Sequence, residues 1–371
     1  MLLFTPGPTP VPESVRLAMA TPTLHHRTPE FEAIFASARA NLLKLFGMEE
    51  AVMLASSGTG AMQAAVVNIC QKKALSINAG KFGERFGKIV ESFGFESVVL
   101  EYEWNQPAQV EDIALILEKE PDIDTVCIQV CESAGGLRHP VEEIAEYIKS
   151  QNRDIAVIAD GITAVGVEYI DTTNIDILIA GSQKALMLPP GLAMIGLSEY
   201  AIDRIGDGRD YYFNLSSEIK KQRKNTTAYT AATTLIIGLN AVFDEIAKSG
   251  GLEQLYKDTK NRANATQKAL ESIGLQIYPD APALAMSTIY DKDAEEIRKI
   301  LKNSYQVNVA GGQDHLKGKI FRINQMGLIP PYQMSWVVNA VELALADLNR
   351  RKYDGSANRI FNENYFGESK I

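Results

Sequence analysis

Short apolar runs that alternate with helix-period segments over the first 200 residues place the strongest constraint on the fold. Two of these runs, Ile155 to Ala159 and Ile175 to Ala180, are almost wholly apolar, which is typical of strands buried on both faces. Alternating strands and helices predict a parallel sheet that helices cover. We therefore expect an α/β fold, with a large domain whose mostly parallel sheet is sandwiched by helices.

The sequence beyond residue 250 has a different pattern. A long helical segment from Leu252 precedes two strand-like runs, a helix at 294–302, a strand at 319–324 and a closing helix at 332–348. We predict a large domain at 1–250, which includes the N-terminal segment, and a smaller C-terminal α+β domain at 251–371. The polar tail from Tyr353 is expected either to pack as an arm or to fray.

A lysine and an aspartate follow two of the apolar runs. Lys184 lies just past the run that begins at Ile175, and Asp160 directly follows Ala159. Open α/β sheets bind ligands at the carboxyl ends of their strands. Burial lowers the pKa of a lysine amine and suits it to Schiff-base chemistry. An amine and a carboxylate at one sheet edge fit pyridoxal 5′-phosphate (PLP), which uses a lysine Schiff base and an acidic partner for its ring nitrogen. On these two residues alone, a buried ion pair is an equal interpretation.

Three further features lie at ends of expected strands. Ser57, Gly58 and Thr59 separate a strand from a helix, where free N–H groups and the helix dipole attract phosphate, although this is also an ordinary helix cap. Phe82 follows another strand among glycines and offers a face for a planar heterocycle, or a side chain for the core. Ser133 is a ring contact or a turn residue. The sequence predicts a cofactor cradle only when these features are taken together.

Composition excludes several classes of protein. The 371 residues are 46% apolar and 22% charged, with a net charge of −9 and no long basic run, which argues against nucleic-acid binding. The segment Met1 to Pro12 does not read as a signal peptide, and no apolar stretch reaches membrane-spanning length, so we expect a cytoplasmic protein with no membrane partner. Cys70, Cys127 and Cys131 are expected to be reduced core thiols, and no metal site is expected.

Taken together, the motifs resemble the class V (fold type I) PLP-dependent aminotransferases, most closely their alanine:glyoxylate and serine:glyoxylate (serine:pyruvate) branch. The similarity runs over nearly the whole chain. The matching segments are Thr5-Pro6-Gly7-Pro8-Thr9, His25-His26-Arg27, Pro29-Glu30-Phe31, Ser57-Gly58-Thr59 with Ala61-Met62, Glu132-Ser133, Asp160, and Ser182-Gln183-Lys184-Ala185-Leu186.

The resemblance implies a role for each site residue. Lys184 would be the Schiff-base lysine and acid/base, and Asp160 the partner of the pyridine nitrogen. Arg322 would bind the substrate carboxylate, with a guanidinium suited to bidentate contact, and Gly7 would also contact substrate. The other expected cofactor-binding residues are Ser57, Gly58, Thr59, Phe82, Ser133, Ile162, Gln183 and Thr230.

One of these residues is expected to act across subunits. Thr230 aligns with a residue that reaches the phosphate of the neighbouring subunit in relatives. Ala231 and Ala232 stand where many relatives carry proline, so Thr227 is the alternative. Either assignment implies a homodimer with a shared active site.

The implied reaction is a ping-pong transamination from a small L-amino acid, with serine or alanine favoured, to glyoxylate or pyruvate. Cysteine desulfurase is disfavoured because no cysteine follows Cys131 and Gln183, not histidine, precedes Lys184. Aminotransferases of phosphonate or purine catabolism and a non-catalytic partner subunit with the same fold stay open. His25 and His26 either shape the pocket or serve in capping and packing.

Overall fold

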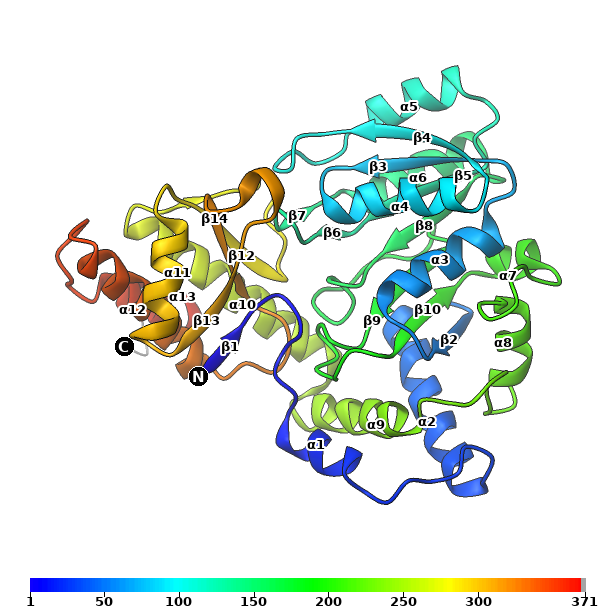
Figure 1. Ribbon diagram of the computed structural model, residues 1–371, viewed down its shortest axis with the longest axis horizontal. Coiled ribbons are helices and arrows are strands. Elements are labelled where there is room, and N and C mark those ends of the chain that lie inside the picture. Colours follow the sequence, from blue (N-terminus) through cyan, green and yellow to red (C-terminus); the bar gives the residue numbers. More distant parts are fainter. Residues whose placement is uncertain (368–371) are drawn as a thin grey trace.

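The computed structural model describes residues 1–367, which form a large part and a smaller part, each built on its own sheet (Figure 1). The large sheet has seven strands in the order β2-β10-β9-β8-β5-β3-β4. Strand β10 is antiparallel to both of its neighbours, and the other adjacent pairs are parallel. The strands are β2 (Glu50–Leu54), β3 (Lys73–Asn78), β4 (Glu96–Glu101), β5 (Thr125–Gln129), β8 (Ala156–Asp160), β9 (Ile177–Gly181) and β10 (Ala193–Leu197).

Helices cover both faces of this sheet. On β9, Ile177 and Ile179 join an apolar cluster with α3, α4, α7 and α8, whereas Leu178 and Ala180 join the cluster on the other face with α2, α5, α6 and α9. Both faces of the strand are therefore dry, which explains its apolar sequence. The helices are α1 (Glu13–Met19), α2 (Pro29–Phe46), α3 (Gly58–Ile69), α4 (Lys81–Ser92), α5 (Val110–Lys119), α6 (Val141–Gln151), α7 (Glu199–Ile205), α8 (Leu215–Gln222) and α9 (Thr233–Lys248).

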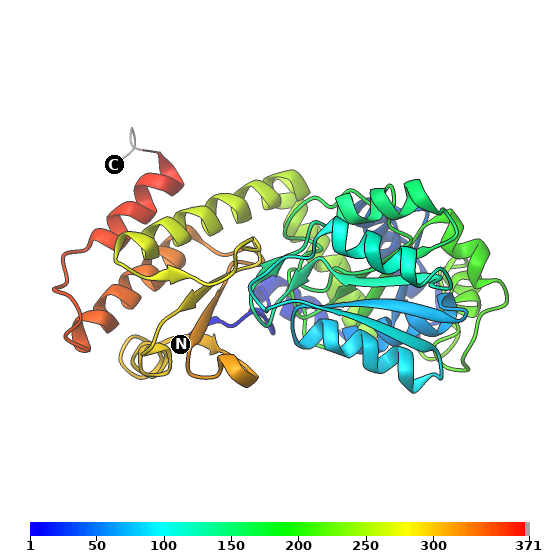
Figure 2. The ribbon, with the colours of Figure 1, turned by 90° about the horizontal axis from the view of Figure 1, so that it is seen from above.

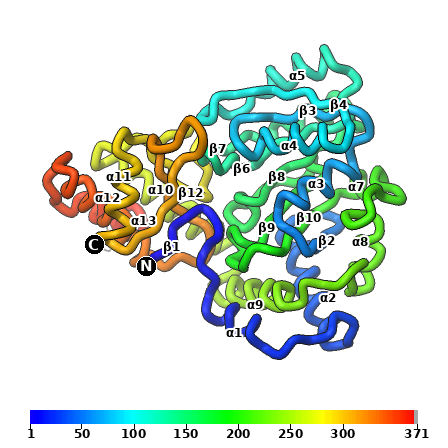
Figure 3. Tube along the Cα trace, in the orientation of Figure 1, coloured from blue at the N-terminus to red at the C-terminus, as the bar shows by residue number. Residues whose placement is uncertain are grey.

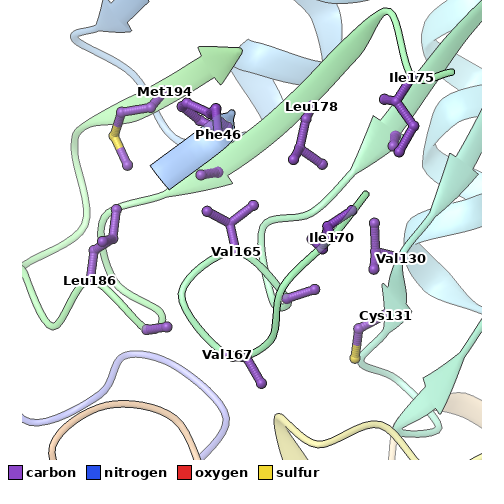
Figure 4. Packing of buried hydrophobic residues seen from close by; sticks show 14 of the residues in the cluster. Phe46, Val130, Cys131, Val165, Val167, Ile170, Ile175, Leu178, Leu186 and Met194 are labelled. Carbon is purple, nitrogen blue, oxygen red and sulfur yellow. The ribbon is translucent and has the colours of Figure 1, made fainter. Parts of the chain in front are cut away.

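The second of these clusters reaches the loops after β8 and β9. Figure 4 shows Leu178, Phe46 and Met194 packed together, with Val165 of the loop after β8 and Leu186 of the loop after β9 in the same cluster. This packing restricts the loops that carry the residues after Asp160 and around Lys184.

The smaller part has a five-stranded sheet in the order β1-β13-β14-β12-β11, with helices packed against it (Figure 2). Its elements are β1 (Leu2–Phe4), α10 (Gly251–Ser272), β11 (Gln276–Ile277), β12 (Met286–Tyr290), α11 (Ala294–Asn303), β13 (Val307–Gly311), a 3₁₀ turn η1 (Asp314–Leu316), β14 (Ile320–Asn324), α12 (Pro331–Asp347) and α13 (Ser356–Phe366).

The N-terminal segment connects the two parts. Strand β1 pairs in parallel with β13 of the small sheet, and the chain then crosses to the large part before α1 (Figure 3). Thr9 fastens this crossing, because its N–H donates to the Gln183 carbonyl (3.0 Å) and its hydroxyl donates to the Lys184 carbonyl (2.7 Å). The small sheet is thereby tied to the loop after β9.

The expected fold class is confirmed: a mostly parallel sheet lies between helices, beside a smaller α+β part. Strands β1, β10 and β13, the short two-stranded hairpin at 131–138 and helices α1, α7, α8 and α9 were not predicted. The C-terminal tail forms α13, whose Phe361 is fully buried against the small-domain core, so the packed arm is the correct alternative for its described part. The last four residues of that tail, 368–371, lie outside the described residues. None of the described helices has the length and apolar character needed to cross a membrane.

Candidate active site

Lys184 lies three residues after β9, with 9% of its surface exposed. Its Nζ donates a hydrogen bond to the carbonyl of Pro6 (2.5 Å). Gly7 packs closely against the Lys184 side chain, because a Cβ added at Gly7 would lie 2.7 Å from Lys184 Cδ and 2.9 Å from Nζ. Gly7 also has φ +94°, a conformation that favours glycine. The Lys184 amine therefore has a hydrogen-bond acceptor in the N-terminal segment. The same side chain leaves no room for a residue larger than glycine at position 7.

Burial lowers the pKa of the Lys184 amine to about 8. The positive charge of Arg322 lowers this pKa further, and the carboxylates of Asp160 and Glu132 oppose the shift. A lysine with such a pKa supplies neutral amine at a pH where an ordinary lysine is almost wholly protonated. The site therefore provides a nucleophilic, proton-accepting nitrogen.

Asp160 ends strand β8, next to β9 in the sheet, and is 4% exposed. Burial raises the pKa of its carboxyl to about 6, while the Ile162 N–H that donates to Oδ1 (2.9 Å) and the charge of Lys184 act in the opposite direction. The Ile162 hydrogen bond fixes the orientation of the carboxylate. Asp160 thus presents a largely ionised acceptor at neutral pH, at the carboxyl edge of the sheet.

Arg322 reaches the same region from β14 of the small sheet and is 8% exposed. Its guanidinium donates to the carbonyl of Gly311 from Nη2 (2.7 Å) and Nε (3.2 Å), and Nη1 donates to the carbonyl of Ser133 in the large part. These partners are neutral carbonyls, and no carboxylate of residues 1–367 forms a direct ion pair with this guanidinium. A guanidinium with only carbonyl partners is able to form charge-assisted hydrogen bonds with a carboxylate.

The loop from Ser57 to Thr59 leads into the N-terminus of α3. No side chain caps this helix, and among residues 1–367 no protein acceptor binds the N–H groups of Gly58 and Thr59. Gly58 lies against Ile162, because a Cβ added at Gly58 would lie 2.4 Å from Ile162 Cδ1. Free N–H groups at a helix N-terminus attract anions. The loop and Ile162 therefore form a cradle next to Asp160.

Arg85 is a residue of this cradle that the sequence interpretation missed. Its Nη1 donates to Thr59 Oγ1 (2.9 Å), and its guanidinium carbon lies 4.7 Å from the centre of the Phe82 ring. The i, i+3 spacing of Phe82 and Arg85 on α4 is the signal that predicts their contact. Arg85 adds positive charge beside the free N–H groups of the α3 N-terminus.

Glu132 is a second missed residue, completely buried on β6 (Cys131–Glu132), which pairs with β7 (Leu137–Arg138). Its Oε2 accepts from the N–H groups of Phe82 (2.9 Å) and Gly83 (3.0 Å), and Oε1 accepts from Ala134 N–H (2.9 Å). Burial raises the pKa of this carboxyl to about 7. A charged residue in an apolar strand-like stretch was the available signal.

The structure does not bring every expected residue to Lys184. Thr230 is exposed and, with Thr227, lines a surface hollow that also includes Ala55 and Phe213. The Thr227 hydroxyl is already engaged, since it donates to the Tyr229 carbonyl (2.5 Å).

The two histidines lie elsewhere on the surface, between α1 and α2. Their rings contact each other with centroids 4.7 Å apart, and the Arg27 N–H donates to His25 Nδ1 (3.3 Å). Their role in a pocket stays a prediction.

Several known proteins are similar to this chain over nearly its whole length. Relatives include an uncharacterized aminotransferase of Helicobacter pylori (52% identity, 99% of this chain, 100% of the relative) and a serine–glyoxylate aminotransferase of Hyphomicrobium methylovorum (28%, 98%, 95%). A protein named soluble hydrogenase, small subunit, from Synechococcus sp. is 31% identical over 96% of each chain.

Solved structures and a family model give the same assignment. An aspartate aminotransferase of Thermus thermophilus superposes with a TM-score of 0.87 at 29% identity, over 94% of this chain and 99% of that chain. The family model described as aminotransferase class-V matches residues 2–326, a span that includes every residue of the site described above. The chain therefore belongs to the class V aminotransferase family and is a transaminase.

Proposed function

We propose that this protein is a PLP-dependent aminotransferase that moves an amino group from a small L-amino acid, with serine or alanine favoured, to glyoxylate or pyruvate. The observation that carries the proposal is the amine of Lys184, whose pKa burial lowers to about 8, with the charge of Arg322 lowering it further and that of Asp160 raising it. The serine–glyoxylate relative supports the choice of substrates.

The residues present fit the cofactor. The free N–H groups of Gly58 and Thr59, with the charge of Arg85, suit its phosphate. Phe82 offers a ring face to the heterocycle, Asp160 offers an acceptor to its ring nitrogen, and Lys184 offers an amine to its aldehyde. Ser57, Ser133, Ile162 and Gln183 complete the proposed contacts. When bound, PLP supplies an aldehyde that takes up the amino group and a ring that withdraws electrons from the substrate carbon.

Each residue of the chain has a distinct task in the proposed reaction. Arg322 binds and orients the carboxylate of both the amino acid and the oxo acid by charge-assisted hydrogen bonds. Lys184 Nζ would take the proton from Cα of the amino donor and, in the second half-reaction, would give a proton to Cα of the acceptor. Gly7 leaves the space in which this amine moves. The Pro6 carbonyl holds this amine on the side of the N-terminal segment.

The proposal is tested by an absorbance spectrum of the purified protein after addition of PLP, followed by titration with single amino acids. A visible band that forms in wild-type protein and is absent in Lys184→Ala is the expected result. L-Serine or L-alanine should then convert the band, and glyoxylate or pyruvate should restore it. L-Aspartate belongs in the panel because the Thermus thermophilus structure is an aspartate aminotransferase. A band that no donor converts would refute the proposed substrates.

A role as a partner subunit is the second candidate, favoured by the name of the Synechococcus relative. The presence of Lys184, Asp160 and the free N–H groups of the α3 N-terminus argues against this candidate, because a non-catalytic subunit does not need these groups. Wild-type protein that forms no visible band with PLP would favour this candidate over transamination.

We also propose a homodimer whose subunits share the active site. Thr230 is exposed, and Tyr211 (82% exposed) and Tyr212 (45% exposed) lie near the same surface hollow. Aromatic side chains are enriched in interfaces between protein chains. This surface is therefore the proposed place where a second copy receives the Thr230 hydroxyl.

A further inference from the structure

Glu132 links two parts of the site that come from different parts of the chain. One carboxylate oxygen, Oε2, binds the first turn of α4 through the N–H groups of Phe82 and Gly83. The other oxygen, Oε1, binds Ala134 N–H and so holds the turn after β6. Both oxygens are used and the side chain has no exposed surface, so its position is fully determined by backbone groups.

The turn that Glu132 holds carries the contact to Arg322. The Ser133 carbonyl accepts from Arg322 Nη1 and is the large-part contact of this guanidinium. Ser133 lies between Glu132 and Ala134, the two residues that the Oε1 hydrogen bond joins. Rotation of this peptide would therefore remove the Arg322 contact.

Gly80 shows how closely the backbone surrounds the carboxylate. A Cβ added at Gly80 would lie 2.5 Å from Glu132 Cδ, although the φ of 161° at Gly80 is open to any residue. The restriction to glycine thus comes from the space that Glu132 occupies and not from backbone strain.

We propose that Glu132 is a positioning residue, which fixes Phe82 on one side and, through the Ser133 carbonyl, Arg322 on the other. It acts on the cofactor through Phe82 and on the substrate carboxylate through Arg322. This inference rests on the proposed function, since it assigns Glu132 to the same PLP site. A single buried carboxylate would then set the geometry of both ligands.

The test compares Glu132→Gln with Asp124→Asn. Asp124 is a matched control, because its carboxylate also accepts three backbone N–H groups (Gln71, Lys72 and Lys73) but precedes β5, at the end of the sheet away from Lys184. In wild-type protein both Glu132 oxygens accept from backbone N–H groups. In Glu132→Gln the side-chain NH₂ replaces one of these oxygens, so at least one backbone N–H group faces a donor and loses its hydrogen bond. Both variants therefore lose hydrogen bonds between a carboxylate and the backbone.

The affinity for PLP is measured by absorbance titration of each cofactor-free protein, and Tm is measured alongside. Both variants should lower Tm, but only Glu132→Gln should weaken PLP binding, by about tenfold, because the N–H groups of Phe82, Gly83 and Ala134 no longer all have an acceptor. In Glu132→Gln the KM for the amino donor should also rise more than kcat falls, through Arg322. Wild-type PLP affinity in Glu132→Gln, or equal weakening in Asp124→Asn, would overturn the inference.

A second pair of variants guards against misfolding of Glu132→Gln. Gly80→Ala displaces the carboxylate while its charge is kept, and it should weaken PLP binding in the same way. Gly87→Ala on the same helix is the control, because a Cβ there would lie an ordinary 3.4 Å from Val99. Unchanged PLP affinity in Gly80→Ala would contradict the inference. Wild-type protein that binds no PLP would overturn the proposed function as well, so the two failures are distinguishable.

Discussion

At the scale of single residues, the protonation of Lys184 sets when the site can react. An amine with a pKa lowered to about 8 is about one-tenth neutral at pH 7, far more than an ordinary lysine with a pKa of about 10.4. The neutral form is the nucleophile, so the rate of PLP capture by cofactor-free protein should rise with pH and level off above about pH 8. Stopped-flow absorbance over a pH series measures this rate. A rate that still rises steeply above pH 9.5 would show that burial does not lower this pKa.

Arg322 and Arg298 offer a paired comparison on the two faces of one sheet. On β13, Ala310 pairs with Arg322 and the next residue, Gly311, pairs with Phe321. Phe321 is buried in the core beneath the helices, and Arg298 of α11 lies beside Gly311. Neighbouring strand residues face opposite sides. Arg322→Ala should raise the KM for the amino donor by about 10- to 100-fold, the value of a charge-assisted hydrogen bond. Arg298→Ala should change this KM much less, because Arg298 acts on Arg322 only through its charge. Steady-state kinetics of both variants decide whether Arg322 binds the substrate.

The sequence predicted the site residues whose position follows from the end of a strand. Asp160 and Lys184 directly follow apolar runs, so their meeting at one edge of the sheet could be inferred. The Pro6 carbonyl and Glu132 could not be found in this way. Most of their contacts join groups that are far apart in sequence, as with Pro6 and Lys184, which are 178 positions apart. Side-chain type and spacing carry no signal for such a contact.

At the scale of elements, the crossing from β1 to α1 controls the space around Lys184. Gly7→Ala would introduce a Cβ 2.7 Å from Lys184 Cδ at φ +94°. Gly94→Ala is the matched control, because Gly94 has φ +77° but no atom within 4 Å of an added Cβ. Both variants should lose stability by about 1–2 kcal/mol from backbone strain. Only Gly7→Ala should also slow PLP capture and turnover. Equal kinetics in the two variants would show that the Gly7 contact is irrelevant to the site.

Three of the strands missed from the sequence were each missed for a physical reason. Strand β1 has three residues and β13 has only alternating burial, so neither shows the continuous apolar run that marked β8 and β9. Strand β10 is fully buried, but it follows β9 without an intervening helix and so breaks the alternation used for prediction. Its antiparallel direction follows from that short connection. The domain boundary near residue 250 stays a prediction.

At the scale of the whole molecule, two sheets in one chain each supply one part of the site. The large sheet carries Lys184 and Asp160, and the small sheet carries Arg322. The N-terminal crossing and the Arg322 contact with Ser133 fix one sheet relative to the other. The proposed phosphate cradle contains a helix N-terminus and Arg85, and Thr227 and Thr230 line a surface hollow. A second copy of the chain is the proposed source of the Thr230 hydroxyl for this cradle.

Mixed dimers test this sharing of the site. If Thr230 serves the neighbouring subunit, a dimer of Lys184→Ala with Thr230→Glu contains one site with both residues intact, and it should keep about half the wild-type turnover per dimer because the two sites are related by symmetry. A dimer of wild type with the double variant Lys184→Ala/Thr230→Glu should be almost inactive. In that dimer the site with the intact Lys184 receives the glutamate at position 230 of the other chain, and the negative charge of this glutamate repels phosphate.

The opposite result is expected if Thr230 serves its own subunit. The dimer of wild type with the double variant would then keep one complete site, and the dimer of the two single variants would have none. Each dimer is prepared by co-expression with two affinity tags, and PLP content and turnover are measured. Thr227→Glu replaces Thr230→Glu in a parallel set. Since the Thr227 hydroxyl is already bound to the Tyr229 carbonyl, we expect the crossed pattern for Thr230 and not for Thr227. A chain that migrates at its monomer mass of 40.7 kDa and turns over substrate would exclude a shared site altogether.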